Sequence, residues 1–229
     1  MTVRPSRRYL RHAALALSLG AVAGCTTPVG GSGMAGGDTA GSPAGPGNPS
    51  QPAIVRVPGH GWHPGGVDGP PPAPGTCRFG TVGGQPLPDR ACTPGAVDTT
   101  VTQENLAATL CRRGGYTDSV RPPREVTDAF KRVARAAYAA PGPSSDYELD
   151  HLVPLGLGGA SDSRNLWPER NIGDPSQYDR SFTRGANAKD GVESRLHTAV
   201  CRGEVSLARA QAAVAANWVT AESVLGVQP

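Results

Sequence analysis

Residues 28–75 consist almost entirely of glycine, proline, alanine, serine and small polar residues, and this segment limits how much of the chain can fold. Such a composition cannot bury enough apolar surface to offset the entropy lost on ordering. A short apolar patch at 54–57 and Trp62 interrupt it without enough context to predict structure. We therefore predict a flexible tether over residues 25–75. Residues 76–229 remain, and they are long enough for one domain with its own core.

The first 24 residues have the pattern of an export signal. Residues 1–12 contain four arginines and no acidic residue, and residues 13–23 form an apolar run that ends in small residues before Cys25. This run is well short of the ~20 residues that a membrane-spanning helix needs. The ending Val-Ala-Gly-Cys resembles the lipobox of bacterial lipoproteins, whose cysteine becomes the lipidated first residue of the mature chain.

By that resemblance, residues 1–24 are a lipoprotein-type signal peptide. Cys25 then anchors the exported protein to the outer face of the cytoplasmic membrane through its lipid. The alternative is an ordinary secretory signal with an incidental cysteine, which leaves the protein secreted. Residues 6–11 also resemble a twin-arginine export motif, so this route and the general secretory route both stay open.

The formal net charge of +3 comes from the leader, because residues 1–24 contribute four arginines and no acid. Residues 76–229 contain 17 basic and 17 acidic side chains. A neutral domain has no overall attraction for nucleic acid, so a nucleic-acid-binding surface must be a local patch. Two groups of residues form either such a patch or an ordinary solvated face: Arg121, Arg124, Lys131, Arg132 and Arg135, and Arg164, Arg170, Arg180 and Arg184.

Four cysteines lie in the predicted domain: Cys77, Cys92, Cys111 and Cys201. An even number in an exported domain indicates two disulfides, for which three pairings are possible. We favour Cys77–Cys92, which closes a segment rich in glycine and proline, and Cys111–Cys201, which ties two helices together. A zinc site is the competing interpretation, but no pair has the short C-x-x-C spacing that structural zinc sites prefer.

Apolar periodicity, caps and breakers predict helices at 99–113, 124–139, 186–202 and 207–218. A strand over 147–153 and a return strand that begins at 165, and that Pro168 cuts off, predict a β-hairpin. The expected fold class is α+β. It is a mostly helical domain around a short β-hairpin followed by a helix, stapled by disulfides.

The predicted hairpin contains Asp150-His151, Pro154-Leu155, Gly158-Gly159 and Asn165-Leu166 in this order. In order and spacing these residues resemble the HNH endonucleases, in which a β-hairpin and the following helix form a ββα-metal site. The resemblance covers residues 147–202 best. It implies that His151 is the general base, that Asp150 is a metal ligand and that Asn165 braces the hairpin by hydrogen bonds.

The chemistry implied by this resemblance suits these residue types. Hydrolysis of a phosphodiester needs an activated water near neutral pH, and histidine has the unperturbed pKa for that task. It also needs compensation for developing negative charge, which a divalent ion held by oxygen ligands supplies. The implied cofactor is Mg²⁺, with Mn²⁺ and Zn²⁺ as alternatives.

The last metal ligand is the weakest part of the match. HNH enzymes place an Asn or His near the start of the helix after the hairpin, often within a zinc knuckle whose cysteines are absent here. Asn187 and Asp190 are the candidates by position. Lys189, Glu193 and His197 resemble the C-terminal helix of exported proteins that carry this hairpin. The alternative is that Lys189 and Glu193 form an ordinary i, i+4 pair and that His197 is a surface residue.

The resemblance therefore implies an exported, membrane-tethered nuclease that hydrolyses nucleic acid with a divalent metal. The substrate, DNA or RNA, stays open, and the sequence points to no protein partner. The alternative is a non-catalytic envelope lipoprotein that keeps a degenerate HNH scaffold for binding.

Overall fold

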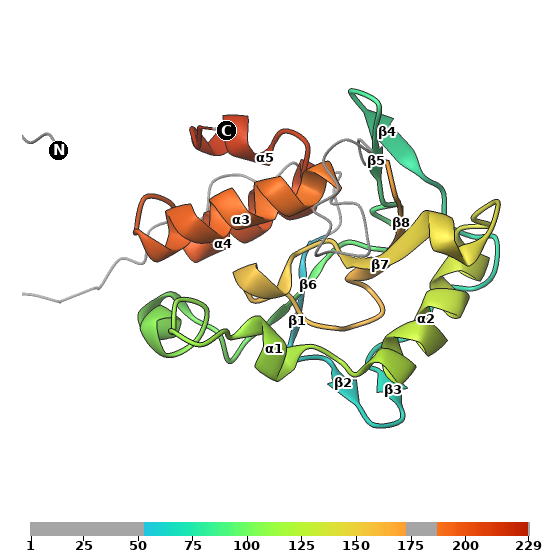
Figure 1. Cartoon of the computed structure of the whole chain (residues 1–229), viewed down its shortest axis with the longest axis horizontal. Helices are drawn as coiled ribbons and strands as arrows, with labels where there is room; N and C mark the ends of the chain where they lie inside the picture. Colours follow the sequence, from blue (N-terminus) through green and yellow to red (C-terminus); the bar gives the residue numbers. More distant parts are fainter. Residues whose placement is uncertain (1–52, 173–186, 229) are drawn as a thin grey trace, which may run out of the picture. The chain divides into compact units, whose positions relative to one another are not determined.

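The computed structural model describes residues 53–172 and 187–228, and the structural statements below concern these ranges. They form a mixture of helices and small two-stranded sheets, with two disulfides (Figure 1). The strands are β1 (Val55–Val57), β2 (Trp62–His63), β3 (Gly66–Val67), β4 (Gly80–Val82), β5 (Gln85–Leu87), β6 (Ala96–Asp98), β7 (Tyr147–His151) and β8 (Leu166–Arg170). The helices are α1 (Thr117–Val120), α2 (Arg124–Ala137), α3 (Ala188–Cys201), α4 (Leu207–Asn217) and α5 (Ala221–Leu225), with 3-10 helices η1 (Gln103–Ala108), η2 (Ser144–Asp146) and η3 (Leu155–Leu157).

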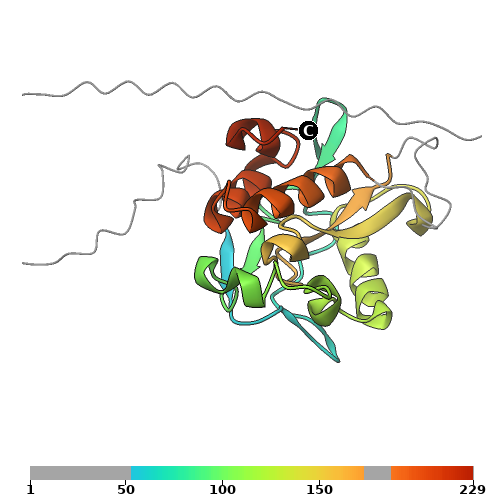
Figure 2. The same cartoon turned by 60° about the vertical axis from the view of Figure 1, so that its left-hand side comes forward.

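The antiparallel hairpin of β7 and β8 lies between two helices (Figures 1 and 2). On one face, Phe130 and Ala134 of α2 pack against Leu166 of β8. On the other face, Trp167 of β8 shares the main core with Val192 and Leu196 of α3. Helices α4 and α5 extend this core behind α3. The hairpin is therefore held on both faces, which gives its side chains a rigid support.

Both predicted disulfides are present. Cys77–Cys92 encloses the β4–β5 hairpin, and Cys111–Cys201 ties the end of α3 to the segment after η1. They join residues 15 and 90 positions apart, so on the chain-entropy account they stabilise the fold by about 3 and 4–5 kcal/mol. The mixed helix and strand content was also predicted correctly.

The predicted tether is wrong over residues 53–75, which are part of the folded unit. Strand β1 pairs in parallel with β6, and Val57 is buried. The indole nitrogen of Trp62 donates a hydrogen bond to the Val120 carbonyl at 2.8 Å. These residues lack a core of their own and fold by pairing with distant parts of the chain. Their composition conceals such pairing.

We expect a chain that starts at residue 76 to be much less stable than one that starts at residue 53. The shorter chain loses the β1–β6 pairing, the burial of Val57 and the backbone bond from Thr99 N to Val57 O. A loss of about 3 kcal/mol lowers the melting temperature of a domain of this size by about 10 °C. Thermal melts followed by circular dichroism measure the difference. Equal melting temperatures would show that residues 53–75 add nothing to the fold.

Two elements differ substantially from their predicted type or extent. The helix predicted over 99–113 is the 3-10 helix η1, because the backbone of Thr109 leaves helical geometry and its hydroxyl bonds to the Asn105 carbonyl. Strand β8 continues through Pro168, which a two-stranded ribbon tolerates because the outer edge of each strand needs no ladder bond.

Candidate active site

Strand geometry places the candidate residues of β7 on two faces. Asp150 and Glu148 share one face, and Trp167 and Glu169 of β8 lie opposite them in the hairpin register. His151 points to the other face, as period-two alternation requires. Trp167 donates its indole N–H to Asp150 Oδ2 at 2.7 Å, which fixes that carboxylate. Asp150 and His151 therefore point to opposite faces of β7. They can border the same site only because the strand ends at His151, where η3 turns the chain.

Asn165 makes the hydrogen bonds expected of a residue that braces the hairpin. It is fully buried, and its Oδ1 accepts from Val153 N at 2.9 Å. Its Nδ2 donates to Val153 O at 2.9 Å and to Ala160 O at 2.8 Å. Gly159 completes the turn, because a Cβ there would lie 1.8 Å from Val153 O. The loop between β7 and β8 is thus closed by one amide and one obligatory glycine.

His151 is buried but borders a pocket. The residue is 8% exposed, and its Nε2 lies 2.9 Å from Ser161 Oγ. Burial, together with the charges of Arg121 and Lys189, lowers the pKa of His151 to about 3. The imidazole is therefore neutral at physiological pH, and in the free protein it is a weak base. Within the described part of the chain, no hydrogen bond engages Nδ1.

Ser161, the partner of His151, is held by the segment that was predicted to be tether. Its backbone N–H donates to His60 O at 2.7 Å. A Cβ at Gly61 would lie 2.9 Å from Ser161 N, so only glycine allows this approach. The neighbouring Ser163 donates its backbone N–H to Asp68 O at 2.8 Å. Residues 60–68 thus position His151 through Ser161.

Lys189 lies at the centre of the acidic face of the hairpin. Its side chain is 1% exposed, and Nζ contacts Asp150 Oδ2 at 2.9 Å, His151 O at 2.8 Å and Glu193 Oε1. Burial opposes its charge, but the carboxylates of Asp150, Glu193 and Glu169 outweigh burial and raise the pKa of Lys189. The pair with Glu193 is therefore no ordinary surface pair. It joins α3 to the end of β7.

Carboxylates crowd around this ammonium and disturb one another. Burial, with the charges of Asp150 and Asp190, raises the pKa of Glu148 to about 7. Burial likewise raises the pKa of Glu193 to about 7. Glu169 is 1% exposed, its Oε2 has no hydrogen-bond partner among the described residues, and burial raises its pKa well above the ordinary range. One lysine does not neutralise this many acids, so Glu169 holds a proton near neutral pH and Glu148 and Glu193 are partly protonated there.

The two metal-ligand candidates on α3 lie at its N-terminus. Asn187 is buried; its Nδ2 donates to Glu148 Oε1, and its Oδ1 accepts from Ile172 N at 3.1 Å. Asp190 is exposed, and its Oδ2 accepts the N–H of Asn187 at 2.9 Å. Although the residue as a whole is exposed, partial desolvation of its carboxyl group and the charge of Asp150 raise the pKa of Asp190. Asn187 is thus a structural bridge to Glu148, while Asp190 keeps an oxygen near Asp150.

His197 connects α3 to the segment that follows η1. Its Nε2 lies 3.0 Å from Leu110 O and 3.6 Å from the Sγ of Cys201, which belongs to the second disulfide. The ring also packs beneath Gly156, where a Cβ would lie 3.7 Å from it. His197 borders the same pocket as Asp150, but its hydrogen bonds indicate a structural role.

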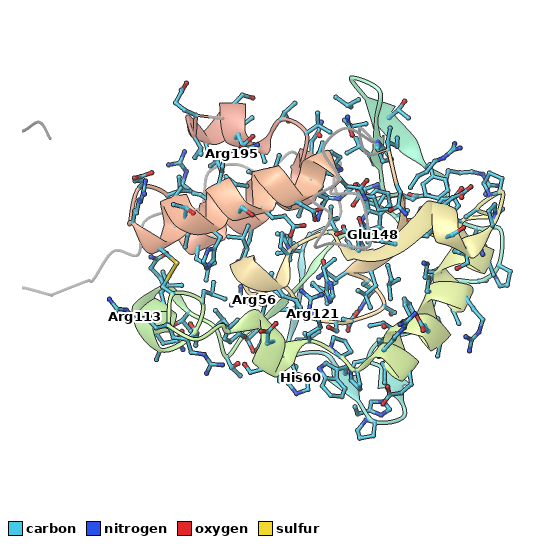
Figure 3. The ribbon with its side chains drawn as sticks, viewed as in Figure 1. Arg56, His60, Arg113, Arg121, Glu148 and Arg195 are labelled. Carbon is cyan, nitrogen blue, oxygen red and sulfur yellow. A yellow bond between two sulfur atoms is a disulfide. The ribbon has the colours of Figure 1, made fainter. Side chains whose placement is uncertain are left out.

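A pocket of about 470 Å³ brings most of these groups together, and we call it the site pocket. One wall carries Glu148, Asp150, Asp190 and Glu193, and the pocket is also bordered by His151 and Arg121. Arg121 is exposed, and it lies close enough to His151 to lower its pKa. Figure 3 labels Arg121, from the turn before α2, and Glu148, from β7. The pocket thus presents acids, one neutral imidazole and one guanidinium to the same volume.

The donor chemistry of this pocket suits a hard divalent cation, since its ligands are carboxylate oxygens. Among residues 53–172 and 187–228, however, no three His, Cys, Asp or Glu side chains are already arranged to hold a metal ion. Lys189 and Trp167 both contact Oδ2 of Asp150, so an ion would approach the other oxygen, Oδ1. A bound ion therefore requires Asp150, Glu148 or Asp190 to change rotamer.

Sequence reasoning missed four residues of the site as observed. Glu148 was detectable, because it shares a strand face with Asp150 at i, i+2. Arg121 was included only in a general basic patch. Glu169 depends on the register of the hairpin, and Ser161 depends on a contact from residues 60–68. Neither signal is present in local sequence.

Comparisons of the chain with protein-family models, with curated proteins and with solved structures found no match. None of the helices within the described ranges has the length and hydropathy of a membrane span. The predicted signal peptide, Cys25, Arg180 and Arg184 lie outside the described residues.

Proposed function

We propose that this protein hydrolyses phosphodiester bonds of nucleic acid with the help of a divalent cation, and that it does so outside the cytoplasm, tethered through Cys25. The observation that carries the proposal is the pocket in which surplus carboxylates, a neutral histidine and a guanidinium meet. Phosphodiester hydrolysis needs these three kinds of group: a cation site, a proton acceptor and an anchor for phosphate.

Each group has a distinct task in this proposal. Arg121 binds a non-bridging oxygen of the phosphate, since a guanidinium matches that geometry. His151 accepts the proton of the attacking water, and Ser161 holds the ring by its Nε2. A phosphate beside Arg121 offsets the positive charge that helps to lower the pKa of His151. Substrate binding thereby makes the imidazole a better base.

Asp150, Glu148 and Asp190 are the residues proposed to hold the cation. Mg²⁺ is proposed, because it prefers carboxylate oxygens and retained waters, with Mn²⁺ as a close substitute and Zn²⁺ as another alternative. The bound ion supplies compensation for negative charge on the phosphate. Lys189 holds Asp150 in place from the opposite side and keeps α3 against the hairpin.

One observation favours the rival proposal, a non-catalytic envelope lipoprotein with a degenerate HNH scaffold. The ammonium of Lys189 already contacts Asp150 and Glu193, which is a cation built into the chain. In that case the pocket binds a ligand without hydrolysing it. The two proposals differ in whether a metal ion activates the protein.

Removal of metal tests the proposal. The purified full chain is incubated with labelled single-stranded DNA and RNA in Mg²⁺ and in EDTA, and products are resolved on denaturing gels. We expect cleavage of at least one nucleic acid in Mg²⁺, no cleavage in EDTA and recovery when Mg²⁺ or Mn²⁺ is restored. An Asp150→Asn variant, which keeps the size of the side chain, should lose activity by about 10²-fold or more. Absence of cleavage of both polymers under all metal conditions would favour the rival.

A further inference from the structure

A second pocket, larger than the site pocket, lies along the outer face of α2. Its volume is about 640 Å³, and it is bordered by Arg124, Lys131, Arg132 and Arg135 of the helix, with Ser144 and Tyr147 opposite them. We call this pocket the α2 groove. Four basic residues and one acidic residue, Asp128, line it. In a domain whose basic and acidic side chains are equal in number, this is a local concentration of positive charge.

The one acid does little to cancel this charge. Asp128 pairs with Arg124 at 3.2 Å, but both side chains are largely exposed, so the pair is weak. The guanidinium of Arg132 donates to the backbone oxygen of Asp128, not to its carboxylate. The groove therefore keeps a surplus of basic over acidic side chains, with Arg132 and Arg135 bonded to backbone oxygens.

One cation of the groove is held in a fixed position. Arg135 Nη2 donates to Gly142 O at 2.5 Å and to Ala140 O at 3.4 Å, and its guanidinium lies 5.3 Å from the centre of the Tyr147 ring. These contacts reduce the entropy lost when the arginine binds an anion. An ordinary solvated arginine has no such support.

The α2 groove and the site pocket adjoin the same strand. Tyr147, at the start of β7, borders the groove, and Asp150 and His151, at its end, border the site pocket. Arg121, which borders the site pocket, precedes Arg124 of the groove by three residues. From Arg124 to Arg135 the helix rises about 17 Å. One strand of a nucleic-acid helix advances only about 3.4 Å per phosphate, so several phosphates fit along it.

We propose that the α2 groove binds the phosphodiester backbone of the substrate strand that extends away from the site pocket. This inference rests on the proposed nuclease function. It identifies the surface that would give the protein affinity for a polymeric substrate. The groove offers guanidinium and ammonium groups, and the one aromatic residue that lines it, Tyr147, is buried with Arg135 over its ring, so the groove contacts phosphates and does not select sequence.

Binding is measured without cleavage. The full chain is titrated against a fluorescent 20-nucleotide single-stranded DNA in EDTA, and anisotropy is recorded at several salt concentrations. Replacing Lys131 and Arg132 together by glutamine should weaken binding by at least tenfold at low salt. It should also reduce the slope of log affinity against log salt by about 1.4, for two lost phosphate contacts at ~0.7 each. The matched control is Arg56→Gln with Arg113→Gln, two exposed arginines outside both pockets, labelled in Figure 3.

Equal affinity and equal salt slope for the groove variant and the control would overturn the inference. The same proteins are also titrated against vesicles of anionic phospholipid. A groove variant that binds these vesicles less tightly than wild type but keeps its affinity for DNA would likewise overturn the inference, since the groove would then face a membrane. A cleavage assay in Mg²⁺ separates this failure from failure of the proposed function. If only the inference is wrong, the groove variant cleaves the 20-mer as well as wild type. If the proposed function is wrong, neither protein cleaves it.

Discussion

His151→Ala should abolish cleavage of nucleic acid while the protein stays folded. General-base catalysis contributes about 10²–10⁴-fold, so the turnover rate should fall by that factor. The substitution removes one hydrogen bond, between Nε2 and Ser161 Oγ, and leaves the braces of Asn165 intact. Because removal of the buried ring also leaves a cavity, we expect the melting temperature to fall by about 5–10 °C while the protein remains folded at the assay temperature.

The control for this variant is His63→Ala, an exposed histidine outside the site pocket. Its activity should equal that of wild type. Gel-based cleavage in Mg²⁺ gives the rates, and circular dichroism gives the melting temperatures. A His151→Ala protein that cleaves at the wild-type rate would remove the imidazole from the mechanism. It would leave the carboxylates and Arg121 as the working groups.

Lys189→Met should cause the largest loss of stability among single changes in the site. The methionine fills a similar volume but leaves Asp150, Glu193 and Glu169 without the ammonium that compensates them. Breaking a buried ion pair by removing one partner costs about 3–5 kcal/mol. The hydrogen bond from Nζ to His151 O is lost as well, so α3 is also released from β7.

Urea unfolding at pH 7 measures this loss, with Arg209→Met as the control. Arg209 is exposed on α4, and a surface substitution of this kind changes stability by less than about 0.5 kcal/mol. If the Lys189→Met protein were as stable as the control, then Asp150, Glu193 and Glu169 would be able to bind protons or water without any loss of folding free energy. The ion pairs of Lys189 would then contribute nothing to the stability of the fold.

Parts of this architecture followed from local sequence because local rules decide them. The hairpin and the start of α3 near Asn187 depend on turn residues, caps and short spacings, whereas the brace role of Asn165 was implied by the resemblance to the HNH endonucleases. The disulfides were predicted because four cysteines, in a chain that begins with the pattern of an export signal, allow only three pairings. In each case the deciding groups lie close in sequence or are few in number.

The parts that were not predicted depend on contacts between distant segments. Residues 53–75 fold because β1 pairs with β6 and because Gly61 packs against Ser161. Neither contact can be predicted from the residues next to it in the sequence. Lys189 and Glu193 have the spacing of a surface pair, and that spacing cannot show that α3 packs onto an acidic strand face. The same packing buries the carboxyl groups of Glu148 and Glu169 and thereby raises their pKa values.

Whether a divalent ion enters the site pocket is the question on which the proposed function depends. Crystals of the protein soaked in Mn²⁺ and recorded at the manganese absorption edge answer it directly. We predict an anomalous peak within coordination distance, about 2.0–2.6 Å, of Asp150 and at least one oxygen of Glu148 or Asp190. A map with no peak in the pocket, and with Lys189 still in contact with Asp150 at saturating Mn²⁺, would contradict a metal-dependent mechanism.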